Sequence, residues 1–87
     1  MTKAGFEFRK STYDAYDAQR IVFEAGKYKS EILIADGAKR VNAKSIIGLL
    51  SMKFRTGTEY TVFCEGPDER AAAKGMAKYL GSLEKNG

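Results

Sequence analysis

The sequence contains no histidine, and its only cysteine is Cys64. Histidine and cysteine supply most of the ligands that proteins offer to zinc, so the usual tetrahedral zinc sites are excluded. The same absence excludes a nucleophile that is activated by histidine, as in Ser-His and Cys-His pairs. We therefore expect no metal site, no cofactor and no enzyme. A lone cysteine cannot close an internal disulfide, which fits a reducing compartment.

Long apolar runs are also missing. No run approaches the roughly 20 residues that a membrane-spanning helix needs, and the first ten residues, MTKAGFEFRK, lack the apolar core of a signal peptide. We expect a cytoplasmic protein with no membrane segment. A chain of 87 residues, 44% of them hydrophobic, can form one core but not two, and it contains no linker or repeat. Residues 1–87 are therefore predicted to form a single domain.

The formal net charge is +4, from 15 basic and 11 acidic residues. Acidic residues are interspersed with the lysines and arginines along the whole chain, whereas a nucleic-acid-binding protein more often concentrates its basic residues on one stripe. The charge therefore indicates a solvated surface first and an anionic partner second, with no direct contact to nucleic acid expected.

The first half of the chain alternates short elements. Residues 6–9, FEFR, alternate apolar and charged side chains as a half-buried strand does, so Phe6 and Phe8 are assigned to the core rather than to an RNA-stacking motif. From Ala15, apolar residues recur at helical spacing up to a stop at Gly26. Residues 31–36 and 39–42 are predicted to be strands that form a hairpin around the turn pair Asp36-Gly37.

The second half begins with a short predicted helix that starts at Ser45 and contains Gly48, which lowers helix propensity. A loop over 55–59 leads into a predicted strand over 60–65, rich in aromatic and β-branched residues. Pro67 is placed in the first turn of a last helix, which carries an apolar stripe. The order β-α-β-β-α-β-α predicts an α+β fold with a four-stranded antiparallel sheet and three helices on one face. The stripe consists of Ala72, Met76, Tyr79, Leu80 and Leu83.

Ser45 has two compatible interpretations. Serine is a good helix N-cap because its hydroxyl accepts a hydrogen bond from a backbone N–H, and the Gly48 position rules out a capping box. A phosphate on Ser45 would also be tolerated there, because its negative charge would face free N–H groups at the start of the helix. Spacing alone favours the cap.

The stretches VNAKSIIGLLSM (41–52), TGTEYTV (56–62), CEGPDERAA (64–72) and KYKSEI (27–32) make the chain resemble the HPr family. These are small phosphocarriers of the sugar phosphotransferase system, with an open-faced α+β sandwich fold. VNAKSI and TGTE are similar to the catabolite-repression (Crh) branch, which lacks the carrier histidine. The resemblance implies that Ser45 is phosphorylated by HPr kinase/phosphorylase.

Two positions depart from the family pattern. Counting back from KYKSEI without a gap, Asp14 takes the place of the phosphorylated histidine and Tyr16 that of the following arginine. Phosphohistidine transfer is therefore excluded at this position. Asp14 itself can be a helix N-cap, a fixed negative charge that imitates the phosphorylated carrier, or a carboxylate that accepts phosphate, the last of which needs a metal and a nearby cation.

A short helix after Ser45 cannot bury every side of its apolar run. Ile46, Ile47 and Leu50 are thus either core residues or part of an exposed patch beside a switchable charge. The resemblance implies that this patch, with Tyr16, binds partner proteins.

Taken together, these features predict a regulatory, non-enzymatic protein of the Crh-like kind. The resemblance implies a transcription regulator or a metabolic enzyme as its target. One alternative is an HPr-fold carrier or adaptor with a different set of partners. Another is a small basic nucleic-acid-binding module, whose binding would depend strongly on salt.

Overall fold

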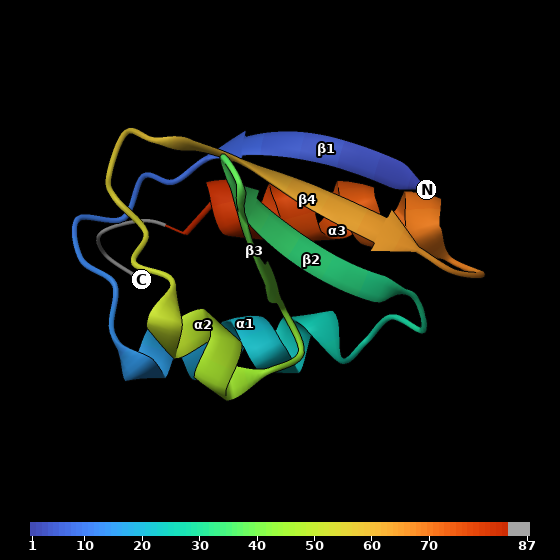
Figure 1. Cartoon of the computed structure of the whole chain (residues 1–87), viewed down its shortest axis with the longest axis horizontal. Coiled ribbons are helices and arrows are strands. Elements are labelled where there is room, and N and C mark those ends of the chain that lie inside the picture. Colours follow the sequence, from blue (N-terminus) through green and yellow to red (C-terminus); the bar gives the residue numbers. More distant parts are fainter. Residues whose placement is uncertain (84–87) are drawn as a thin grey trace.

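The computed structural model describes residues 1–83, and over this range the chain forms four strands and three helices. The sheet is antiparallel throughout, with strand order β1-β4-β2-β3, and the helices cover one of its faces (Figure 1). The predicted α+β open-faced sandwich is therefore confirmed. The elements in chain order are β1 Thr2–Glu7, α1 Ala15–Ala25, β2 Glu31–Asp36, β3 Lys39–Asn42, α2 Ile46–Ser51, β4 Glu59–Glu65 and α3 Glu69–Gly81.

The first strand differs from its prediction. It spans Thr2–Glu7 rather than residues 6–9, because β1 pairs with β4 from Thr2 opposite Cys64 to Glu7 opposite Glu59. Only Phe6 among the strand's residues is buried, so the apolar alternation is weak where pairing begins. Pro67 also lies outside its predicted place, since Asp68 is the N-cap of α3 and the proline precedes it.

The central strands β2 and β4 direct alternate side chains into the core. Ile32, Ile34, Val62 and Cys64 are fully buried and pack with the helices. At one end of this core, five aromatic rings contact one another in stacked and edge-on pairs, which confirms the burial of Phe6 and Phe8. These rings belong to Phe6, Phe8, Tyr13, Phe54 and Tyr60.

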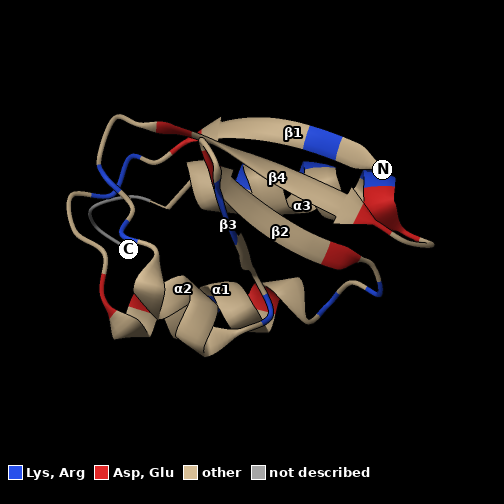
Figure 2. Ribbon diagram, in the orientation of Figure 1, with Lys and Arg blue, Asp and Glu red and all other residues tan. Residues whose placement is uncertain are grey.

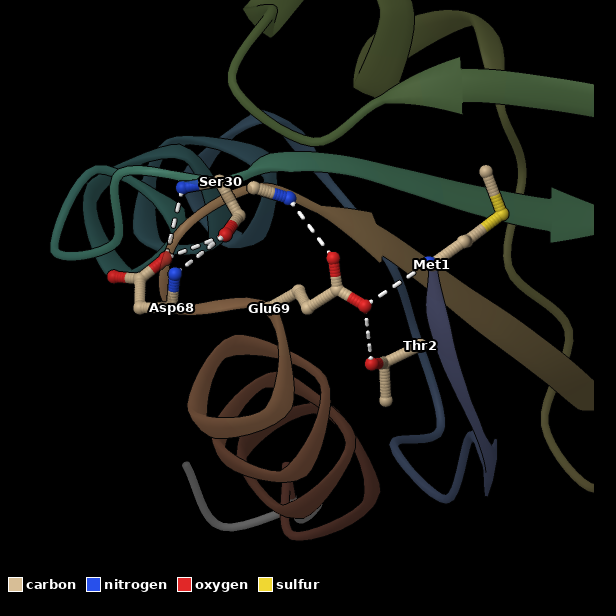
Figure 3. Close-up of polar contacts among 6 residues, drawn as sticks. Met1, Thr2, Ser30, Asp68 and Glu69 are labelled. Carbon is tan, nitrogen blue, oxygen red and sulfur yellow. Dashed lines mark hydrogen bonds and ion pairs between the residues drawn. The ribbon is translucent and has the colours of Figure 1, made fainter.

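A polar network joins the start of α3 to two other parts of the chain (Figure 3). The Asp68 carboxylate accepts hydrogen bonds from the backbone of Lys29 and from both the backbone and the hydroxyl of Ser30. Gly66 lets the chain pass this point, because its φ is +151° and an added Cβ would lie 2.7 Å from the Ser30 Cα. The network therefore fixes the loop before β2 against the loop after β4.

Glu69 connects this network to the N-terminal end of β1. Its Oε2 accepts from the Thr2 hydroxyl at 2.7 Å and lies 3.0 Å from the Met1 amino nitrogen, and its Oε1 accepts from the backbone of Gly66 (Figure 3). These contacts, the Thr2 hydrogen bond first among them, lower the pKa of Glu69 from 4.5 to about 2. The ionised carboxylate thus holds edge strand β1 against α3.

The lowered pKa predicts a pH dependence of stability. Because the folded pKa lies below the unfolded value, the contribution of Glu69 is fully present above about pH 4.5 and is lost as the pH falls toward 2. We expect Glu69→Gln to be less stable than the wild type at pH 6 and to lose less stability between pH 4.5 and 2. Urea unfolding midpoints across this range measure the difference.

Glu59→Gln is the matched control, since the Glu59 side chain is exposed and makes no hydrogen bond or ion pair with the rest of residues 1–83. Parallel pH profiles for the wild type and Glu69→Gln would contradict the assignment.

Candidate functional site

Ser45 is the N-cap of α2. Its backbone is extended (φ −112°, ψ 116°), and its Oγ accepts a hydrogen bond from the backbone N–H of Gly48 at 3.2 Å. The predicted cap is therefore confirmed, and Gly48 at the third helical position leaves no side chain to complete a capping box. Ser45 itself is half-buried. It ends the short segment that connects β3 to α2.

Asp14 is the N-cap of α1, as predicted. Its Oδ1 accepts from the backbone N–H of Asp17, and the Asp17 carboxylate accepts from the backbone N–H of Asp14, both at 3.1 Å. The hydrogen bond from the Asp17 backbone is the largest of the effects that lower the pKa of Asp14. The carboxylate at residue 14 is thus held ionised by the helix that it caps.

Asp17 is the second carboxylate at this helix start, and its burial was not predicted from the sequence. It is only 2% exposed, and its Oδ2 lies 3.3 Å from the Lys10 amino group, which compensates the buried charge. The spacing of two aspartates three residues apart at a helix start is the sequence signal for a reciprocal cap. Nothing local in the sequence indicates that Lys10 folds back onto them.

Tyr13 connects this helix start to α2. Its hydroxyl donates to the Leu49 carbonyl at 2.7 Å, and its ring packs edge-on against Phe54. Burial, reinforced by the nearby carboxylates of Asp17 and Asp14, raises the pKa of the Tyr13 hydroxyl, which therefore remains a donor. This contact couples the loop before α1 to the end of α2.

The apolar run of α2 is divided between core and surface. Leu49 is buried and Ile46 is half-buried against the core, whereas Ile47 is 77% exposed and Leu50 is 46% exposed. The first turn of α1 adds Tyr16, which is 66% exposed with the Arg20 guanidinium 5.7 Å from its ring centroid.

A pocket of about 460 Å³ lies between the loop before α1 and the end of α2. Asp14 and Leu50 both line this pocket, and Lys53 is the basic residue among its lining side chains. Ser45 does not line it. The lining residues are Ser11, Thr12, Tyr13, Asp14, Ala15, Leu50, Lys53 and Phe54.

Within residues 1–83, no three side chains of the metal-ligating types come together as a cation site. None of the helices described there has the length and apolar character to span a bilayer. Basic and acidic residues occur together on strands, helices and loops (Figure 2).

Comparison with known proteins defines the class of this fold and site. The family description "PTS HPr component phosphorylation site" matches residues 10–82. HPr-like protein Crh of Bacillus subtilis is 39% identical over 71 residues, which is 82% of this chain and 84% of the relative. Phosphocarrier protein HPr of Treponema pallidum is 39% identical over 64 residues, covering 74% of this chain and 73% of the relative.

Solved structures of HPr and Crh proteins share the fold of this chain. HPr-C-His from Thermoanaerobacter tengcongensis has a TM-score of 0.85 at 32% identity and covers 94% of this chain and 93% of its own. The crystal structure of Bacillus subtilis Crh has a TM-score of 0.73 at 38% identity, with coverages of 92% and 93%. The curated relatives are named as a phosphocarrier protein and an HPr-like protein, and neither name is that of an enzyme. The chain belongs to the HPr family, and Crh proteins are among its relatives.

The N-cap hydrogen bond of Asp14 is expected to raise the thermal stability of the fold. Asp14→Ala removes the acceptor for the Asp17 backbone N–H, and we expect the midpoint of thermal unfolding to fall by about 4–8 °C. Asp14→Asn should stay close to the wild type, since asparagine caps helices as well as aspartate. Calorimetry at pH 7 tests both. Equal losses in the two variants would show that the charge of Asp14, rather than its capping oxygen, stabilises the fold.

Proposed function

We propose that the protein is a Crh-like regulatory member of the HPr family that is phosphorylated on Ser45 and carries no phosphate at residue 14. The observation that carries the proposal is the position of the Ser45 hydroxyl at the start of α2, the helix that carries the exposed Ile47 and Leu50 two and five residues further on. The absence of histidine supports the second half of the proposal.

The proposed modification transfers the γ-phosphoryl group of ATP to the Ser45 Oγ. ADP leaves, and the hydroxyl proton is released. The product adds a charge of about −1.5 to −2 next to backbone N–H groups that α2 leaves without helical partners. The present cap is a single 3.2 Å hydrogen bond to Gly48, so phosphate oxygens can replace it while the helix stays in place.

The proposed switch acts on a docking surface formed by the exposed Tyr16, Ile47 and Leu50, with the half-buried Ile46 beside them. Exposed apolar side chains beside a residue that gains charge fit a partner whose binding depends on the phosphate. The family resemblance supports HPr kinase/phosphorylase as the modifying enzyme and a transcription regulator or metabolic enzyme as the target. A single domain over residues 1–87, acting in the cytoplasm, completes the proposal.

One observation favours a second candidate, an HPr-fold adaptor with a different set of partners. Tyr16 stands where the family has an arginine, and it is 66% exposed beside Arg20. The cation is thereby displaced by about one helical turn along α1. A partner that recognises the family arginine would meet an aromatic ring instead.

The proposal predicts that the protein accepts one phosphate from ATP and none from phosphoenolpyruvate. We expect ATP and HPr kinase to add a single acid-stable phosphate to Ser45, detected by intact mass and peptide mapping. Phosphoenolpyruvate with the general phosphotransferase enzyme should add none, because residue 14 is not histidine.

Ser45→Asn is the sharpest variant, because asparagine keeps an N-cap but has no hydroxyl. Its labelling should fall to background, whereas Ser51→Ala, in the same helix, should be labelled like the wild type. An unmodified Ser45 after treatment with an active kinase would contradict the regulatory role. Phosphate on Asp14 in the second reaction would instead establish a carrier role.

A further inference from the structure

The outer face of the sheet is not covered by any helix of residues 1–83, because all three helices pack on the other side (Figure 1). Side chains alternate along a strand, so the burial of Ile32, Ile34 and Val62 against the helices places the residues between them on the outer face. The strand register orders these outward residues into four rows across the sheet. The rows are Glu65–Glu31, Lys3–Phe63–Leu33–Asn42, Gly5–Thr61–Ala35–Arg40 and Glu7–Glu59.

The centre of this face is apolar. Phe63 and Leu33 lie opposite each other on the two central strands, and both are half-buried. The Arg40 guanidinium reaches across from edge strand β3 and lies 4.4 Å from the centroid of the Phe63 ring. A guanidinium that is stacked on an aromatic ring keeps its N–H groups available for a carboxylate.

The charges of the outer face are separated by sign (Figure 2). Its two cations stand at the lateral edges, Lys3 on β1 and Arg40 on β3. The carboxylates form the first and last rows, called the end rows below, where two glutamates lie directly opposite each other. Such like-charge pairs destabilise a sheet. Within residues 1–83, Glu7 pairs with Arg9 at 3.7 Å, and the other charged side chains named here form no ion pair.

This pattern is complementary to itself after a quarter turn. Lys3 and Arg40 are three strand spacings apart, which is roughly 14 Å across the sheet, and the end rows are roughly 20 Å apart along it. Two such faces packed with their strands crossed at about 90° bring the cations of each copy over the end rows of the other. Aligned strands would instead place end row against end row.

The size of the face indicates a weak complex. Four strands and the roughly 20 Å between the end rows give a footprint of roughly 400 Å² per copy. A standard stable interface buries about 800 Å² per partner. A nucleic-acid strand fits this face less well than a second copy does, because its phosphates would meet the carboxylates of the end rows.

We propose that two copies of the chain associate weakly through the outer faces of their sheets, with the strands of the two sheets crossed. The apolar centres come into contact, and Lys3 and Arg40 of each copy pair with end-row carboxylates of the other. Ser45 and Ile47 lie on the helical side, so the association does not rest on the function proposed above. A dimer presents the helical surface twice, which strengthens binding to a partner with two sites.

Self-association of the full chain is measured at low salt over protein concentrations from about 20 µM to about 2 mM. Sedimentation gives the mean mass, and NMR gives the backbone amide shifts. We expect the mass to rise from that of a monomer toward that of a dimer. The shifts should centre on Gly5, Leu33 and Phe63 and leave α1 and α2 unaffected. Added salt should weaken the association, because exposed ion pairs are screened.

Reversal of the two cations tests the ion pairs. The acidic-edge variant, Lys3→Glu with Arg40→Glu, changes two exposed side chains and should weaken association about tenfold or more. Its matched control is Lys74→Glu with Lys78→Glu, which makes the same change in net charge at two exposed positions of α3. The control should associate like the wild type.

A second variant excludes a general loss of folding as the cause. The basic-end variant, Glu59→Lys with Glu65→Lys, also changes exposed positions and should be as weak as the acidic-edge variant when alone. An equimolar mixture of the two variants should associate again, because opposite charges then face each other. Ser45→Asn should associate like the wild type.

Several results would overturn the proposal. These are a monomer mass that stays constant up to the highest concentration, shifts centred on the helices, or association that persists in the acidic-edge variant. A mixture of the two variants that stays monomeric would also contradict it. Outer-face shifts with a thymidine oligonucleotide of about 12 nucleotides, in a chain that is monomeric alone, would assign the face to nucleic acid instead.

Discussion

The one-sided burial of the sheet is the constraint on which the rest of this structure depends. β2 and β4 lie at its centre, and their inward side chains must be covered on one face only, which three helices do. Each helix therefore has one buried and one outward side. The outward sides of α1 and α2 carry Tyr16, Phe23, Ile47 and Leu50, which are four of the five large apolar side chains that are exposed over residues 1–83. Partner binding is thus expected on the helical layer.

The three helices begin in three different ways, and the differences bear on function. α2 begins at Ser45, whose hydroxyl caps the helix and is the phosphate acceptor that we propose. α1 begins at Asp14, whose carboxylate is committed to a reciprocal cap with Asp17. α3 begins at Asp68, whose carboxylate bonds to a distant loop instead of its own helix. Asp14, which we propose to stand at the position of the family's carrier histidine, is thus part of a structural cap in this chain.

The elements that depend on local signals were predictable. The hairpin over 31–42, the caps at Asp14 and Ser45 and the stop at Gly26 follow from residue types within a few positions. β1 was displaced in its prediction because Thr2, Ala4 and Gly5 give little apolar alternation, and only pairing with β4 makes them a strand. The contact of Lys10 with Asp17 and the network of Ser30 with Asp68 join residues that no sequence pattern relates.

The sequence by itself determined the order of the elements and the family, because these depend on periodicity and short motifs. It also excluded phosphohistidine transfer, because that chemistry needs a histidine and the composition contains none. Only the tertiary structure decided which apolar residues are exposed. Ile46 and Ile47 are adjacent and chemically identical, yet one packs against the core and the other faces solvent. Phe23, by contrast, lies off the apolar stripe of Ala18, Ile21 and Ala25, so the helical period already predicts its exposure. For Ile46 and Ile47, burial is set by long-range packing, which local patterns do not encode.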